Sequence, residues 1–333
     1  MAIFITWNVA GGASFYNLAI RAGTIGKEKE RNYRMARKQF YPYLIMTVPF
    51  FILVVLFNYV PLWGWVLAFV DYSPGRSIAD SSFAGLKYFR QLFDSTSDFG
   101  LVLRNTLVLS FLQLLLTPLP VILAIMITNV RKRWYSRLVQ TVTSFPHFTS
   151  WIIVYSVFFA FFSIDDGALN KLLYSTLHWI DEPTNLLADE RYSWWLMTFA
   201  TLWKTAGWTA IIYIAAITGI DQEQYQAAEV DGANRWQQAL HITIPGIMPT
   251  FIILLLINIG NMLNIGFDQY YVFHNALVHN RIEVIDTYTY RIGITELNFS
   301  YATAAGIFKS FVSITLLFAA NRFSRLTTGH SIM

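Results

Sequence analysis

The chain has 333 residues, of which 55% are hydrophobic, 17% aromatic and only 13% charged. A soluble domain of this composition would have too little polar surface to cover itself, so the composition indicates a membrane protein. The sequence contains no cysteine, which excludes disulfides, thiolate metal sites and a cysteine nucleophile.

The first 40 residues combine an apolar start with a basic stretch at 27–38. They lack the basic beginning of a secretory signal, and Gly11 and Gly12 interrupt the apolar run. We therefore expect residues 1–40 to form a cytoplasmic segment with a helix that lies at the membrane interface.

Six apolar runs that could each cross a membrane follow this segment. A span needs about 20 helical residues. The runs begin near Leu44, Leu101, Val139, Ser193, Thr250 and Tyr301. We expect an all-α membrane protein with six transmembrane helices over residues 41–325, and a short cytoplasmic tail over residues 326–333.

The placement of charge predicts which side of the membrane each loop faces. With both termini on one side, that side carries 14 Lys and Arg residues and the other side carries seven. Acidic residues show the opposite bias, with six against 14. Positive residues concentrate on the cytoplasmic side of membrane proteins, so both termini and the loop at 221–246 are expected to be cytoplasmic.

Three polar stripes run along otherwise apolar spans at helical spacing. Amides and hydroxyls that faced lipid would have no partner, so these stripes must pack inward or line water. We interpret the second-span stripe as bonds between helices, and the fifth-span stripe as part of a substrate pathway. The stripes are Thr106, Ser110, Gln113 and Thr117; Thr201, Lys204, Thr205 and Trp208; and Asn258, Asn261, Asn264 and Asp268.

Two lysines, Lys204 and Lys309, are expected near the middle of the fourth and sixth spans. A charge facing lipid there costs about 2.5–3.5 kcal/mol, so both should face protein or a cavity. The spans offer no obvious carboxylate to pair with them. Two interpretations stay open: the lysines contact an anionic substrate along its pathway, or they bond helix-end carbonyls or a second subunit.

The polar segment between the fourth and fifth apolar runs predicts two short helices joined by a glycine turn. Asp221 can cap the first helix, with Gln224 three residues on, and Gly232 can end it. Asn234 and Gln237 repeat the capping pattern. In the second helix an apolar stripe, suited to the membrane surface, is formed by Trp236, Leu240 and Ile244.

This helix-turn-helix resembles the EAA loop of binding-protein-dependent ABC importers. Two positions depart from that pattern: Gln226 replaces a glutamate and Ile244 replaces a leucine. The glutamine at 226 removes the charge that the family's glutamate offers for an ion pair with an ATPase. The residues that the resemblance implies for ATPase coupling are Tyr225, Gln226, Ala227, Ala228, Glu229, Asp231, Gly232, Ala233, Ile242 and Pro245.

Other pieces of the chain resemble the polysaccharide and oligosaccharide branch of these permeases, and most of all the first permease subunit of alginate oligosaccharide importers. The pieces lie at 104–107, 145–151, 203–208, 286–291 and 299–303. The resemblance implies the type I importer permease fold in a bacterial inner membrane. It also implies a second permease, two cytoplasmic ATPases that hold ATP and Mg, and an extracytoplasmic solute-binding protein that delivers an oligosaccharide.

The sequence offers no catalytic or metal-binding constellation of its own. It has no P-loop pattern, so we expect no enzyme activity and no cofactor on this chain. Its six histidines are scattered without metal-ligand spacing. The substrate pathway is expected to use Lys204, Trp208, Asn258, Asn261, Asn264 and Lys309. The alternatives are a self-sufficient secondary transporter, a membrane-embedded glycan enzyme, or an ABC permease for another cargo.

Overall fold

The computed structural model describes residues 42–130, 132–164, 166–179 and 182–328. Helices dominate these residues, and the pairing of extended backbone among them is a single isolated bridge between Val70 and Phe83. The chain divides into two compact units, Met1–Gly64 and Trp65–Met333. The interfacial helix expected within residues 1–40 and most of the tail expected at 326–333 lie outside the described residues.

Among the described residues, four helical segments are long and apolar enough to cross a membrane. They are Pro42–Phe69, Phe99–Thr128, Arg235–Gly260 and Phe299–Leu326. They coincide with four of the six expected spans. Within the first unit, the described residues 42–64 belong to the first of these helices, and nearly all of its side chains are exposed.

The expected third span is not one straight helix. Helix α6 (Arg133–Ser144) passes through a 3₁₀ turn, η4 (Phe145–Phe148), into α7 (Trp151–Phe162), and the direction changes by 107°. The bend follows from Pro146, which removes a backbone donor, and from the extended backbone of Thr149 and Ser150. If the bent pair counts as one span, the described residues contain five.

The expected fourth span corresponds to α9 (Glu190–Thr218), a helix of 29 residues. It is long enough to cross a membrane, but Lys204 and several threonines and tryptophans make it less apolar than the four segments above. The count of six spans therefore stays a prediction.

Helix α9 is the element around which the second unit packs. Near its C-terminal end, Ala210 and Tyr213 share a buried cluster with α5 (Pro118–Thr128) and α12 (Ile244–Gly260). Near its N-terminal end, Met197 and Ala200 pack with Phe158 of α7 and with α13 (Asp268–Phe273). The helix thus contacts α5 and α12 near one end and α7 and α13 near the other.

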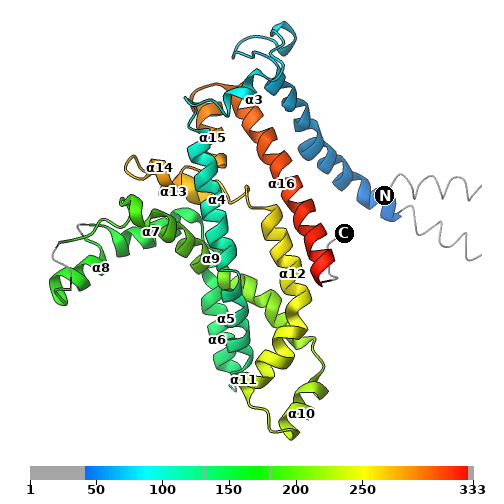
Figure 1. The fold of residues 1–333 in the computed structure, drawn as a ribbon, viewed down its shortest axis with the longest axis vertical. Coiled ribbons are helices and arrows are strands. Elements are labelled where there is room, and N and C mark those ends of the chain that lie inside the picture. Colours follow the sequence, from blue (N-terminus) through cyan, green and yellow to red (C-terminus); the bar gives the residue numbers. More distant parts are fainter. Residues whose placement is uncertain (1–41, 131, 165, 180–181, 329–333) are drawn as a thin grey trace, which may run out of the picture. The chain divides into compact units, whose positions relative to one another are not determined.

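The remaining helices complete the second unit at its outer loops and at its last span. Helix α4 (Phe99–Leu115) leads into α5, and α16 (Phe299–Thr328) lies beside α12 (Figure 1). The loop segments contain α3 (Lys87–Gln91), α8 (Ala168–Asn170), η5 (Lys171–Thr176), α14 (His279–Ile282), α15 (Ile285–Tyr290) and η7 (Arg291–Thr295).

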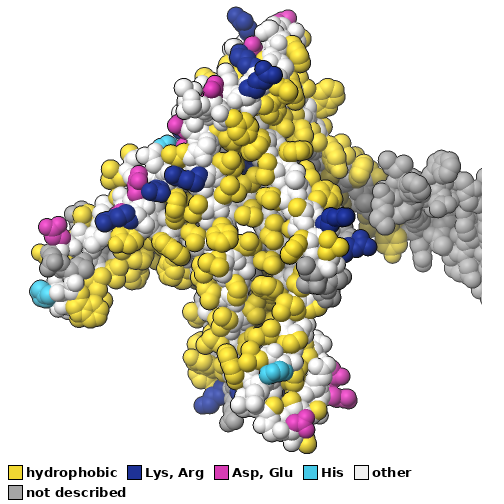
Figure 2. All heavy atoms as spheres, in the orientation of Figure 1, with side chains coloured by type: hydrophobic (Ala, Val, Ile, Leu, Met, Phe, Trp, Pro, Cys, Tyr) yellow, Lys and Arg dark blue, Asp and Glu magenta, His cyan; other side chains and the backbone are white. Residues whose placement is uncertain are grey.

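The surface of the second unit is apolar over its long helices. Figure 2 shows hydrophobic side chains along α4, α5, α12 and α16, while acidic side chains gather around α10 (Gln222–Val230). Apolar side chains such as Phe111, Met126, Phe311 and Phe318 are each more than half exposed. Such a surface suits lipid or another membrane subunit.

Candidate coupling hairpin and polar cavity

The segment 221–246 folds as a helical hairpin with well-defined ends. Helix α10 begins at Asp221, whose side chain accepts a hydrogen bond from the backbone N–H of Glu223 at 2.9 Å. It ends with Gly232 at φ +77°, in the left-handed region. The N–H of Gly232 donates to Glu229 O and the N–H of Ala233 to Ala228 O, at 3.1 and 2.8 Å. This pair of bonds is a Schellman motif, which favours glycine at the left-handed position.

The second helix of the hairpin is continuous with a span. Helix α11 (Arg235–Gln238) starts with a capping box, in which Asn234 and Gln237 each accept a hydrogen bond from the other's backbone N–H. A π-helical turn, η6 (Ala239–Thr243), then leads directly into α12. Pro245 follows this π-helical turn directly and lacks the backbone donor that a regular helix would use at its position.

Two contacts hold the hairpin in place, one within it and one to a membrane helix. The Tyr225 hydroxyl lies 2.9 Å from Thr243 Oγ1, which joins the two helices of the hairpin at the start of α12. Arg235 Nη1 donates to the carbonyl of Asn129, the residue that ends α5, at 2.5 Å. The hairpin is therefore hydrogen-bonded to the C-terminal end of α5 and continuous in backbone with α12.

The outer surface of the hairpin is exposed and mixed in character. Val230 is 89% exposed and Trp236 is 72% exposed. Glu223, Glu229 and Asp231 are exposed beside them. Large exposed apolar side chains among carboxylates are typical of a surface that binds another protein.

The three polar stripes meet at one cavity of about 320 Å³. Helix α4 contributes Ser110 and Gln113, and α9 contributes Thr201 and Thr205. The end of α12 and the residues after it contribute Asn258, Asn261 and Asn264, all three of which are exposed. The described residues that line the cavity include amides and hydroxyls but no charged side chain.

Part of this polar lining also bonds one helix to another. Gln113 Nε2 of α4 lies 3.2 Å from the Tyr270 hydroxyl, and the Thr201 hydroxyl of α9 lies 2.7 Å from Gln269 Oε1. Thr106, which does not line the cavity, accepts a hydrogen bond from Ile285 N. These contacts agree with the interpretation of the second-span stripe as bonds between helices.

Lys204 and Trp208 do not line the cavity. Lys204 Nζ donates to the carbonyls of Pro146 and His147 at 3.1 and 3.0 Å, and also to the carbonyl of Thr149. Trp208 stacks on the ring of His147, with ring centroids 4.7 Å apart. Both side chains therefore face the bend between α6 and α7.

Lys309 has a carboxylate partner that sequence reasoning did not find. Its Nζ pairs with Asp286 Oδ1, and both side chains are mostly buried. The sequence offered no obvious carboxylate within the spans, and the partner Asp286 lies outside them, in α15 of the preceding loop. A role of Lys204 or Lys309 in contacting substrate stays a prediction.

Comparison with known proteins places the chain in a family. Residues 116–328 match the family described as "Binding-protein-dependent transport system inner membrane component". The chain belongs to this family. The protein is therefore a multi-pass membrane permease of the ABC transporter class, and the type I importer permease fold expected from the sequence is confirmed.

Individual relatives of this permease are similar over most of its length. It is 42% identical over 278 residues to Protein LplB of Bacillus subtilis (strain 168), covering 83% of this chain and 86% of the relative. It is 41% identical over 302 residues to the polygalacturonan/rhamnogalacturonan transport system permease protein YteP of the same organism, covering 90% and 92%.

A solved structure shares the fold of the permease. It is that of a bacterial alginate ABC transporter in complex with an alginate pentasaccharide-bound periplasmic protein. One of its chains is 34% identical, with a TM-score of 0.79, and the match covers 89% of this chain and 98% of that one.

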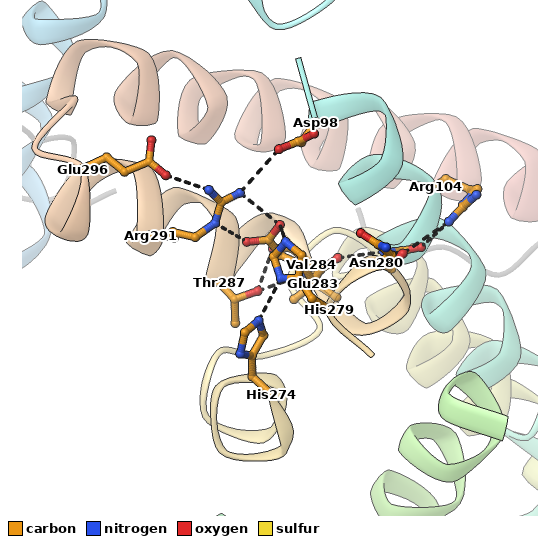
Figure 3. A network of polar contacts seen from close by, with 11 residues as sticks. Asp98, Arg104, His274, His279, Asn280, Glu283, Val284, Thr287, Arg291 and Glu296 are labelled. Atoms are coloured by element: carbon orange, nitrogen blue, oxygen red, sulfur yellow. Dashed lines mark hydrogen bonds and ion pairs between the residues drawn. The ribbon is translucent and has the colours of Figure 1, made fainter. Parts of the chain in front are cut away.

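The permease also holds a polar network between its last two long helices, which sequence reasoning missed. The carboxylate of Glu283 is only 2% exposed and binds Arg291 through two bonds, at 2.7 and 3.2 Å. Arg291 also bonds Glu296 at 2.6 Å and lies 3.9 Å from Asp98 (Figure 3). The hydrogen bonds that Arg291 donates to the Glu283 carboxylate raise the pKa of Arg291, which keeps the guanidinium charged.

Two histidines extend this network. His279 Nε2 lies 3.3 Å from Glu283 Oε2, and His279 Nδ1 lies 2.8 Å from His274 Nε2 (Figure 3). Part of the His274 side chain faces solvent, but its Nε2 end is packed against His279. Desolvation is the main cause that lowers the pKa of His274, and the electrostatic interaction with His279 lowers it further. No group of three metal-ligating residues occurs in the part of the chain that the structure describes.

The lowered pKa of His274 predicts that acid destabilises this network. Between the ordinary histidine pKa of about 6.5 and the lowered pKa, the unfolded chain binds more protons than the folded chain, so folding stability falls as the pH drops. One proton gives at most about 1.4 kcal/mol per pH unit. Because His274 is partly exposed, the expected slope is clearly smaller.

The measurement is the melting temperature of the detergent-solubilised protein from pH 7.5 to pH 5. His274→Gln should flatten its fall on acidification, whereas His241→Gln, which changes an exposed histidine of the hairpin, should leave the profile unchanged. A profile that is the same in His274→Gln and in the parent protein would contradict this assignment.

Proposed function

We propose that the permease is one of two membrane subunits of an ATP-driven importer that carries an oligosaccharide. The observation that carries this proposal is the hairpin at 221–246, which is capped at its turn, hydrogen-bonded to the end of α5 and continuous with α12. A separate protein that displaces such a hairpin would also displace the two membrane helices attached to it. The family to which the chain belongs supports the same role.

The proposed assembly contains a second permease, two ATPases and a solute-binding protein. The excess of basic residues on one side supports a cytoplasmic hairpin and cytoplasmic termini, on the side where ATPases with ATP and Mg would be available. The solute-binding protein would deliver cargo to the opposite face. The alginate transporter, whose structure includes a periplasmic protein, supports this arrangement by likeness.

The coupling contact is proposed to involve Tyr225, Gln226, Ala227, Ala228 and Glu229 of α10 and Asp231, Gly232 and Ala233 of the turn. Ile242 and Pro245 lie on the path from α11 into α12. Gln226 is exposed and uncharged, so it can offer the ATPase a hydrogen bond but no ion pair. The exposed carboxylates of Glu223, Glu229 and Asp231 are then the available anionic contacts.

The substrate pathway is proposed to use the polar cavity between α4, α9 and α12. Sugar hydroxyls need both donors and acceptors, and the amides of Asn258, Asn261 and Asn264 offer both. Two similar proteins carry names that refer to uronate polymers, alginate and polygalacturonan/rhamnogalacturonan. An acidic glycan is therefore the cargo class that we propose first.

ATP binding and hydrolysis would drive the change in access. Moving a two-state gate from 1:99 to 99:1 takes about 5.5 kcal/mol of differential binding. The sequence of this chain has no P-loop, so the partners would supply this free energy. Purified alone, the permease should hydrolyse no ATP.

The hairpin is tested by Gly232→Asp in the importer reconstituted in liposomes. Gly75→Asp is the matched control, because Gly75 also has a positive φ, +90°, and a side chain has open space at both positions. Each change costs about 1–2 kcal/mol of backbone strain. Only Gly232→Asp strains the turn of the proposed ATPase contact, and it should lower ATP-driven uptake by about tenfold or more.

Gly75→Asp should retain uptake within about twofold of the parent, because the same backbone strain then falls in a loop outside the proposed coupling contact. Full uptake by Gly232→Asp would contradict the proposed role of the hairpin in coupling to the ATPase. Uptake by the permease alone, abolished by an ionophore, would indicate a secondary transporter instead.

The cavity is tested by Asn261→Asp, with uptake of a uronate oligosaccharide and a neutral one measured side by side. A carboxylate on the cavity wall should repel the acidic cargo, and 1.4 kcal/mol of repulsion corresponds to about tenfold lower uptake. Asn261→Ala removes the amide without adding charge and should affect both cargoes equally. Equal uptake of both cargoes by Asn261→Asp would exclude this position from the pathway.

A further inference from the structure

The bend between α6 and α7 places backbone carbonyls where helical hydrogen bonds are interrupted. The 3₁₀ turn Phe145–Phe148 and the extended residues Thr149 and Ser150 lie between the two helices. In a membrane, a carbonyl without a partner costs several kcal/mol. A break of this kind therefore needs donors from elsewhere in the protein.

Lys204 of α9 supplies these donors. Its ammonium group has three N–H bonds and reaches three carbonyls, those of Pro146, His147 and Thr149. The carbonyl of Pro146 also accepts from the Thr149 backbone N–H, so the lysine matters most to the other two. The residue is 8% exposed, and its Nζ lies 5.3 Å from the centre of the Trp151 ring.

The same face of α9 fits closely against the bend. A Cβ atom at Gly207 would lie 2.1 Å from the carbonyl oxygen of Thr143, so only glycine allows this approach. One position further on, Trp208 stacks on His147 with an angle of 2° between the rings. The side chain of Ser144 is buried at this contact.

Helix α9 also leads into the hairpin. It ends at Thr218, and after Gly219 and Ile220 the chain reaches Asp221, which caps α10. A displacement of the hairpin is therefore passed to α9 through a short connection. What is fastened to α9 will move with it.

We propose that Lys204 is a positioning residue that fastens the bend of the third span to α9, so that the two move together when the hairpin moves. Its ammonium is occupied by backbone carbonyls and does not contact cargo. This inference rests on the proposed function, because the movement that it transmits is the one that the hairpin receives.

The first experiment measures uptake by the complete reconstituted importer. Lys204→Met removes every donor and should lower uptake of a neutral and an acidic glycan by the same factor, about tenfold or more, as expected for the loss of buried charged hydrogen bonds. Lys204→Arg keeps donors and should recover a large part of the uptake. ATP hydrolysis stimulated by the binding protein should fall less than uptake does.

A second measurement reports on the contact between α9 and the bend of the third span, which we call the joint. Ser144→Cys introduces the only thiol of this otherwise cysteine-free chain, at a site that is 6% exposed. Its labelling by a small methanethiosulfonate should be about tenfold faster when combined with Lys204→Met, since loss of about 1.4 kcal/mol opens the joint ten times as often. Lys309→Met, which removes the other membrane lysine, should not change the rate.

If Lys204→Met is not recovered from the membrane, Gly207→Ala tests the same joint without changing charge. It should also accelerate labelling, because the added methyl forces the bend away from α9. Unchanged labelling in these variants, or a loss of uptake confined to acidic cargo, would overturn the proposal. A parent complex that imports no glycan but shows the expected labelling would refute the proposed function while leaving the joint intact.

Discussion

The structure depends on one constraint: polar groups inside an apolar membrane must find their partners within the protein. Helix α9 provides several of these partners. Its Thr201 contacts Gln269, its Lys204 binds the carbonyls of the bent third span, and its C-terminal end leads to the hairpin. The helix therefore connects the polar cavity, the bend and the proposed contact with an ATPase. A shift along this helix would be felt at all three places.

The same constraint shapes the proposed pathway. Lys204 and Lys309 are the lysines expected at mid-membrane, and both have partners within the chain, backbone carbonyls for one and Asp286 for the other. The cavity is left with neutral amides and hydroxyls from its described lining residues. Such a wall matches the hydroxyls of a glycan and supplies no positive charge to a uronate. Any cationic contact for an acidic cargo would then come from other surfaces of the assembly.

Features with local causes could be predicted from the sequence, and features with distant causes could not. The capping by Asp221, Gly232 and Asn234 depends on neighbours a few residues away, so the hairpin was predicted closely. One detail differs: the Asp221 side chain accepts a hydrogen bond from Glu223 and not from Gln224. The polar stripes followed from helical spacing, but their meeting at one cavity required the packing of three helices. The Lys309–Asp286 pair and the buried Glu283–Arg291 pair each join residues whose proximity depends on the folded loops, which periodicity does not reveal.

The central claim is that the hairpin meets a nucleotide-driven partner, and a cysteine crosslink tests it most directly. Val230 is 89% exposed on the hairpin, and the chain has no cysteine of its own, so Val230→Cys gives a single defined attachment point. In the membrane-embedded complex it should crosslink to an ATPase subunit, with a yield that changes when ATP is added. Trp179→Cys, 74% exposed in the loop between α7 and α9, should give no such product. Crosslinking of Val230→Cys to the solute-binding protein, or to no ATPase at all, would contradict the account.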